Sequence, residues 1–157
     1  MFIINTQVHP AQTIYIKAIM TATTSVLMAE AAAMALAAIV TICLGLQQAI
    51  FLSDNQQLVH FLNGLDQANP PEWRIKYFTQ TFSNFTGQRD MRILRVQRAH
   101  NQTADVLARQ ALLESQSPVS SGLLCNCSNA AHVQCTLLEA LQPVALNSVR
   151  LLTAVCC

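Results

Sequence analysis

The sequence predicts an α/β domain, and three features of the chain support that class. Hydrophobic residues make up 52% of the 157 positions and charged residues 11%, which excludes general disorder, since disordered chains are polar and rich in charge. Gly and Pro are scarce, at four and five residues, which argues against a turn-dense all-β chain. In the first third, an Ala-, Leu- and Met-rich stretch typical of a helix gives way at Gln47-Gln48 to a short apolar run typical of a buried strand.

Strand and helix patterns alternate over the first 113 residues. In chain order, we expect strands over 2–8 and 13–21, a helix over 27–46 and a strand over 49–53. A short helix with Leu58, Phe61, Leu62 and Leu65 at helical spacing follows, then a helix over 72–86, a strand over 91–96 and a last helix after Asn101. The first two strands flank His9-Pro10-Ala11-Gln12, which predicts a hairpin. Gly64 is expected to end the short helix and Gly87 the next one, because glycine favours helix C-termini.

Two of these helices have a predicted buried face. On the helix over 72–86, apolar side chains recur at helical spacing at Ile75, Phe78, Phe82 and Phe85. On the last helix, which Asn101 is expected to cap, the inward positions are Ala104, Leu107, Ala108 and Ala111.

The long apolar run has a second interpretation. Between Glu30 and Asp54 lie 23 consecutive residues without a formal charge, which is long enough to span a bilayer. Thr41, Gln47, Gln48 and Ser53 interrupt the run and its alanine-rich half is weakly hydrophobic, so we favour a soluble domain over a membrane anchor.

Composition divides the chain into three parts: a domain over 1–113, a Ser- and Pro-containing linker over 114–124, and a Cys-rich tail over 125–157. Of six cysteines only Cys43 precedes the tail, so the domain reads as an intracellular, thiol-poor core rather than a disulfide framework. The tail contains Cys125-x-Cys127-x₄-His132-x₂-Cys135, whose residue types are those of zinc ligands. Only one residue separates the first two cysteines, which would strain the tetrahedral coordination of zinc. Reduced surface thiols are the alternative interpretation.

Three acidic residues occupy distinctive positions. Glu30 lies near the start of the long helix, Asp54 directly follows an apolar strand, and Asp105 lies near the start of the last helix. Each taken alone is explained by helix capping or by compensation of the helix dipole. Catalytic groups of α/β sheets, however, gather beyond the carboxyl ends of strands, and Asp54 follows such an end.

Taken together, the segments around these acids resemble the ribonuclease H-like domain of plant proteins related to retrotransposons. The matching segments are Met28-Ala29-Glu30-Ala31, Leu52-Ser53-Asp54-Asn55 and Asn101-Gln102-Thr103-Ala104-Asp105-Val106-Leu107-Ala108, with Pro71-Glu72-Trp73-Arg74-Ile75 and Val96-Gln97-Arg98 between them. The resemblance covers residues 2–113, and the tail also resembles the C-terminal extension of such proteins. It implies a mixed sheet flanked by helices and Mg²⁺-dependent cleavage of the RNA strand of an RNA–DNA hybrid.

The resemblance also implies a ligand set. Family members use four carboxylates, of which three align with Glu30, Asp54 and Asp105, the candidate catalytic and Mg²⁺-binding residues. The fourth comes from the first, central strand, but residues 1–29 contain no Asp or Glu and Phe2-Ile3-Ile4 matches the family's second strand. We therefore expect an N-terminally truncated domain with little or no ribonuclease activity, because two metal ions about 4 Å apart need all of their ligands.

Basic residues concentrate in the second half of the domain. Seven of the nine lie between Arg74 and Arg109. Arg92, Arg95, Arg98 and His100 are the candidate nucleic-acid contacts, since such clusters bind phosphates; an edge strand protected by charge is the alternative. The predicted partner is an RNA–DNA hybrid or another nucleic acid, with no membrane. The alternative function is a non-catalytic protein-interaction or membrane-anchored protein built on the apolar run 31–53 and the Cys-rich tail.

Overall fold

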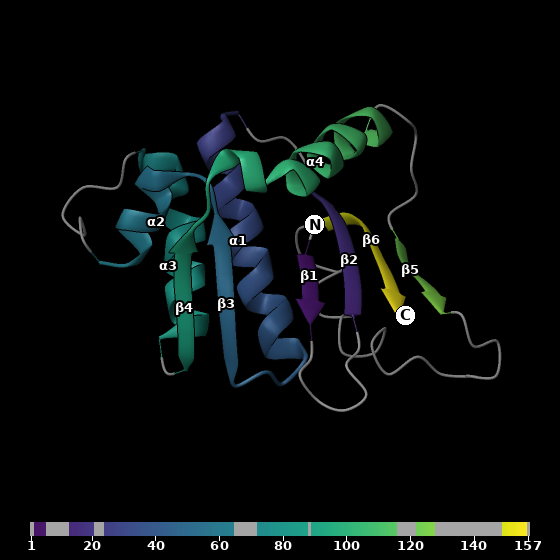
Figure 1. The fold of residues 1–157 in the computed structure, drawn as a ribbon, viewed down its shortest axis with the longest axis horizontal. Coiled ribbons are helices and arrows are strands. Elements are labelled where there is room, and N and C mark those ends of the chain that lie inside the picture. The colour runs from purple at the N-terminus through teal and green to yellow at the C-terminus, as the bar shows by residue number, and fades with distance from the viewer. Residues whose placement is uncertain are drawn as a thin grey trace. The chain divides into compact units, whose positions relative to one another are not determined.

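The computed structural model describes residues 2–5, 13–20, 24–64, 72–87, 89–115, 122–127 and 149–156 (Figure 1). They form two compact units, one spanning Ala22–Thr103 and the other combining Met1–Thr21 with Ala104–Cys157. The predicted hairpin turn at 9–12 and the loop at 69–71 lie outside the described residues.

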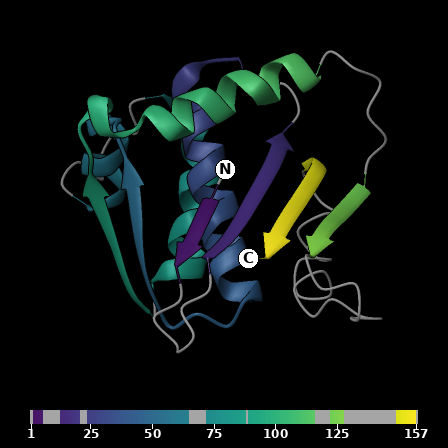
Figure 2. The same ribbon diagram turned by 45° about the vertical axis from the view of Figure 1, so that its right-hand side comes forward.

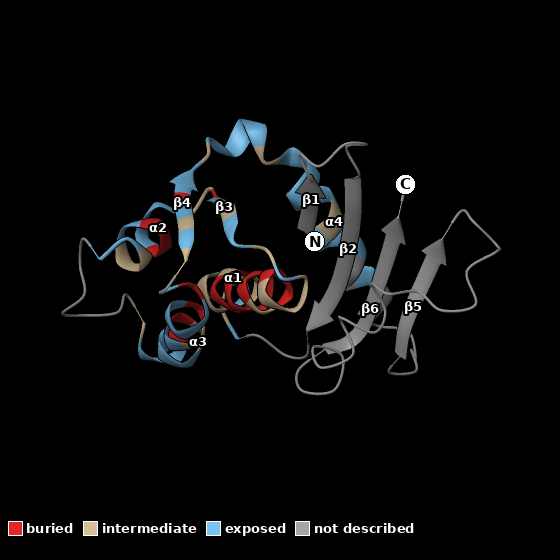
Figure 3. Ribbon diagram, turned by 90° about the horizontal axis from the view of Figure 1, so that it is seen from below, coloured by how far each residue is buried: buried red, intermediate tan, exposed pale blue. Residues whose placement is uncertain are grey.

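The Ala22–Thr103 unit is built on two parallel strands. β3 (Gln48–Ser53) pairs with β4 (Asp90–Arg95) in a register that runs from Gln48 opposite Asp90 to Ser53 opposite Arg95. The helical elements of this unit are α1 (Val26–Cys43), α2 (Gln56–Leu62), η1 (Trp73–Ile75), α3 (Lys76–Thr86) and η2 (Arg98–His100). Figure 3 shows α1 and α3 on the same side of the two strands. The predicted order of elements is confirmed, with bounds that differ by up to three residues.

Helix α1 has both of its ends fixed by specific hydrogen bonds. At the N-terminus the Ser25 hydroxyl accepts from the Met28 backbone N–H at 3.1 Å, which satisfies one of the free donors of the first turn. At the C-terminus Gly45 adopts a φ of +68°, and its N–H donates to the Ile42 carbonyl. The helix therefore ends at Cys43, three residues before the predicted end at 46.

The core of this unit combines small residues of α1 with aliphatic and aromatic side chains, of which Leu58, Ile75 and Val40 are the largest that are fully buried. Ala31, Ala35 and Ala38 of α1 are buried, so the backbones of α1 and α3 can approach closely. The rings of Phe51 in β3 and Phe82 in α3 pack edge to face with centroids 5.1 Å apart. This pair joins the strand to the helix layer.

Two predicted burial patterns are wrong in part. On α3 the buried positions are Thr79, Phe82 and Thr86, preceded by Ile75, whereas Phe85 is exposed. The threonines can be buried because each hydroxyl donates to a carbonyl one turn earlier, Thr86 Oγ1 to Phe82 O at 2.9 Å for example. On α4 (Gln102–Ser115), Ala104 and Ala108 are exposed rather than inward, since an alanine methyl is too small a side chain to mark one face.

Strand β3 is covered on one face only. Phe51 and Ser53 are buried, but Ile50 and Leu52 on the other face are exposed, as is Leu94 of β4, which lies opposite Leu52. The apolar composition of this strand predicted burial on both faces. The difference arises because α1 and α3 cover one side of a two-stranded sheet (Figure 3).

Helix α1 is long and apolar enough to cross a membrane by length and composition. Half of it is buried inside the folded chain, as in the core helix of a soluble protein, which passes the same test. Nine of its residues, from Ala31 to Thr41, are buried. Half of this helix is therefore surrounded by other parts of the folded chain.

The second unit contains a four-stranded sheet in the order β1-β2-β6-β5 (Figure 2). β1 (Phe2–Asn5) and β2 (Thr13–Met20) form the predicted antiparallel hairpin. β6 (Val149–Cys156) pairs antiparallel with β2 and parallel with β5 (Gly122–Cys127). Part of the Cys-rich tail is therefore strand, while His132 and Cys135 lie outside the described residues.

The described strands form two sheets, whereas one mixed sheet was expected. The edge strands, which pair with a described strand on one side only, are β1 and β5 in one sheet and β3 and β4 in the other. Both ends of the predicted linker belong to regular structure, because α4 continues to Ser115 and β5 begins at Gly122. Residues 116–121 between them lie outside the described part of the chain.

Candidate carboxylate site and nucleic-acid surface

Asp54 directly follows β3, in a turn that is fixed on both sides. The Asn55 side chain caps α2 by accepting from the Leu58 N–H at 3.1 Å, and the Asn55 N–H donates to the hydroxyl of the buried Ser53. The carbonyl of Ser53 accepts from the Val96 N–H at 3.0 Å, which ties the end of β3 to the end of β4. The half-buried Asp54 carboxylate is thus held at the carboxyl ends of two parallel strands.

A residue distant in the sequence contacts this carboxylate. The side-chain amide of Asn101 donates from Nδ2 to Asp54 Oδ1 at 3.0 Å across 47 positions. Its backbone N–H in turn donates to the carbonyl of Arg98, the first residue of η2, and so closes this short helix. We predicted Asn101 as a helix cap, and its contact with Asp54 had no sequence signal beyond its place in the Asn101-to-Ala108 motif.

Glu30 is the other candidate acid in the Ala22–Thr103 unit. It is the fifth residue of α1, one position beyond the first turn in which it was expected. The side chain is half-buried, and its Oε2 atom is excluded from solvent.

Asp105 lies in the first turn of α4, within the other unit of the chain. In the described part of Ala22–Thr103, no three His, Cys, Asp or Glu side chains lie close enough to hold a metal ion. The three predicted ligands are therefore divided between two units, and their convergence on one site stays a prediction.

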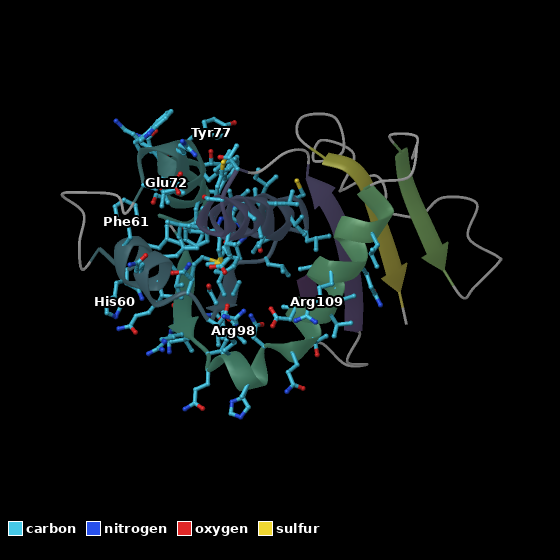
Figure 4. The ribbon with its side chains drawn as sticks, turned by 90° about the horizontal axis from the view of Figure 1, so that it is seen from above. His60, Phe61, Glu72, Tyr77, Arg98 and Arg109 are labelled. Atoms are coloured by element: carbon cyan, nitrogen blue, oxygen red, sulfur yellow. The ribbon has the colours of Figure 1, made fainter. Side chains whose placement is uncertain are left out.

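The predicted nucleic-acid residues differ in how they are engaged. Arg92 forms an exposed ion pair with Asp90 at 3.7 Å, a type of contact that contributes little to stability. Arg95, Arg98 and His100 are exposed, and their side chains make no hydrogen bond or ion pair with the described residues. These three groups follow one another along the end of β4 and η2, and Figure 4 shows the labelled Arg98 side chain. Their donors remain available to phosphate oxygens.

Two other basic residues of the same cluster have structural partners. Arg89 donates from Nη1 to the Leu46 carbonyl at 2.7 Å and so closes the loop between α1 and β3. Arg74 donates from Nη1 to Thr24 Oγ1 at 3.1 Å and pairs with Glu72. Sequence clustering alone did not separate these residues from the exposed ones.

The geometry defines a class of protein: an α/β domain with an acidic residue at the carboxyl end of a parallel strand and exposed cations beside it. A family model described as reverse transcriptase-like matches residues 8–111. The chain belongs to this family, and the match supports a retrotransposon-related ribonuclease H-like domain. No curated protein and no solved structure matches the chain.

Proposed function

We propose that this chain binds nucleic acid through a plant-type, retrotransposon-derived ribonuclease H-like domain, and that its preferred ligand is an RNA–DNA hybrid. The family match over residues 8–111 carries the proposal, because it includes every candidate acid and basic contact. Asp54, fixed at the carboxyl ends of β3 and β4 and hydrogen-bonded by Asn101, supports it from the geometry.

In this proposal Arg95, Arg98 and His100 contact phosphates of the hybrid, while Glu30, Asp54 and Asp105 are the oxygen ligands for Mg²⁺. Carboxylate oxygens are the ligands that Mg²⁺ prefers. When bound, the metal helps to form the attacking hydroxide and stabilises the leaving oxygen of the phosphodiester. Asn101 orients Asp54, whose Oδ2 accepts no hydrogen bond from the described residues.

We further propose that hydrolysis is impaired in this chain. By the resemblance, three carboxylates align where the family uses four, and residues 1–29 contain no Asp or Glu that could supply the fourth. Each tenfold loss of rate corresponds to only about 1.4 kcal/mol of transition-state stabilisation, so a lost ligand is expected to cost orders of magnitude.

Binding is tested by titrating an RNA–DNA hybrid at two salt concentrations. The expected result is an affinity that falls with salt, and a shallower salt dependence for the double variant Arg95→Gln with Arg98→Gln, because each lost phosphate contact lowers the slope by about 0.9. The matched control is Arg92→Gln, whose guanidinium already pairs with Asp90. Absent or salt-independent binding would favour the protein-interaction alternative.

Cleavage is tested on the same hybrid with and without Mg²⁺. We expect weak or no cleavage by the 157-residue chain, and recovery when an Asp-bearing strand is fused before Phe2. Efficient Mg²⁺-dependent cleavage by the unmodified chain, abolished by Asp54→Asn, would contradict the impairment. Failure of the fusion to cleave while it still binds the hybrid would contradict the role of the missing strand.

A further inference from the structure

The start of α3 exposes two large aromatic side chains that the proposed hybrid site does not use. Trp73 in η1 is 77% exposed and Tyr77, one helical turn later, is 69% exposed. Figure 4 shows Tyr77 projecting outward from α3, near Glu72. Single exposed apolar residues are ordinary, but two large rings so close in sequence form a surface that needs an explanation.

Both rings are held in place by neighbouring side chains. The Arg74 guanidinium lies over the Trp73 ring at 5.7 Å from its centroid. Arg74 is itself fixed by Thr24 and Glu72, and Glu72 accepts from the Ser25 hydroxyl at 2.9 Å. Tyr77 packs edge to face on the half-buried Phe78, with centroids 5.4 Å apart. Rings ordered before binding lose little conformational entropy when a ligand stacks on them.

The charges around the rings favour an anionic ligand. No Asp or Glu occurs from residue 73 to residue 89, whereas Arg74 and Lys76 are exposed there and the amide of Gln80 follows one turn later. The nearest acid in the sequence, Glu72, is engaged by Ser25 and Arg74. Lysine is depleted in protein–protein interfaces, whereas aromatic residues and arginine are enriched there, so the exposed Lys76 and the local absence of acids are the features that favour nucleic acid over a protein partner.

We propose that Trp73, Arg74, Lys76 and Tyr77 form a stacking surface for single-stranded nucleic acid, separate from the hybrid contacts at Arg95, Arg98 and His100. Bases stack on the two rings and the adjacent phosphates pair with Lys76. Such recognition is tolerant of sequence, because every base presents an aromatic face. The proposal rests on the proposed nucleic-acid function and adds a second class of ligand, single-stranded RNA or DNA.

The chain offers a direct probe, since Trp73 is its one tryptophan. Titration with oligouridylate is expected to quench tryptophan fluorescence, and Tyr77→Ala is expected to weaken binding at least about fivefold, which corresponds to about 1 kcal/mol. Tyr77→Phe keeps the ring and is expected to bind like the wild type. Lys76→Gln is expected to lower the salt slope by about 0.7.

Hybrid binding serves to separate this proposal from the previous one. Tyr77→Ala is expected to leave hybrid affinity unchanged, and Arg95→Gln with Arg98→Gln is expected to leave oligouridylate quenching unchanged. Hybrid binding without any quenching by oligouridylate would overturn the stacking surface alone. Self-association of the wild type that Tyr77→Ala abolishes, without quenching, would assign the rings to a second copy of the chain and also overturn it.

Discussion

The hydrogen bond between Asp54 and Asn101 is predicted to couple the end of β3 to the segment that leads into α4. Asn101 Nδ2 donates to Asp54 Oδ1 at 3.0 Å, and both side chains are half-buried. A hydrogen bond to a charged group contributes about 1.5–3 kcal/mol when it is well buried. Because both partners retain partial access to water, we expect a coupling free energy of about 1 kcal/mol.

A double-mutant cycle measures this coupling. The variants are Asp54→Ala, Asn101→Ala and the double variant, and the free energy of unfolding of each is obtained from urea denaturation. The control cycle uses Asp90→Ala and Arg92→Ala, an ion pair of 3.7 Å whose side chains are 56% and 70% exposed. We expect the control coupling to lie below about 0.5 kcal/mol and to decrease with salt.

The result that would refute this reasoning is a coupling at Asp54 and Asn101 no larger than that of the control pair. It would mean that the amide does not hold the carboxylate in solution, and that Asn101 acts only as a helix cap. In that case Asn101→Ala would still lower stability, but by the same amount whether or not Asp54 is present.

Three further outcomes are expected. Phe82→Ala should lower the free energy of unfolding by about 3–5 kcal/mol in urea denaturation, because Phe82 is 2% exposed and packs on Phe51. Phe85→Ala, at a 38% exposed position of the same helix, should lower it by less than about 1.5 kcal/mol. Equal losses for the two variants would contradict the packing of α3. Burial raises the pKa of the Cys43 thiol, so peptide mapping should find this thiol alkylated more slowly near neutral pH in the folded chain than after unfolding. The free energy of unfolding should fall as pH rises above the thiol pKa of the unfolded chain, about 8.5, through the higher pKa of the folded chain. Alkylation of the folded chain at the unfolded rate would contradict the burial of this thiol. Carbonate washing should release the expressed chain from membranes, and retention in the pellet would favour the membrane-anchored alternative.

Local sequence patterns predicted most of the Ala22–Thr103 unit. Strong helix formers predicted α1, and Gly64, predicted to end the next helix, has a φ of 76°. The Ser25 cap of α1 was not predicted, and Gly45, whose φ of 68° follows the observed end of this helix, lay inside the predicted range 27–46. The burial of Thr79 and Thr86 could not be predicted from the sequence, since threonine is a polar residue. Its hydroxyl can be buried here because it donates a hydrogen bond to a carbonyl of the preceding turn.

Long-range relations were harder to predict for a different reason. The contact between Asp54 and Asn101 spans 47 positions, and nothing in the local composition of either segment encodes it. The exposed outer face of β3 was missed because composition gives the polarity of a strand but not the number of layers that cover it. The division of the strands into two sheets likewise depends on pairing between distant segments.

During synthesis, helix α1 leaves the ribosome before α3, the helix that packs against it. The helix ends at Cys43, but α3, which packs against it, ends at Thr86. At typical elongation rates of about 5–20 residues per second, the ribosome adds the roughly 40 intervening residues in about 2–9 seconds. During that interval a helix whose one charged residue is Glu30, and which passes the length and composition test for a membrane span, is exposed to chaperones and to the translocation machinery. Any substitution that slows the docking of α3 lengthens the time for which α1 is exposed. Impaired folding of this protein would therefore lead to mistargeting as well as to aggregation.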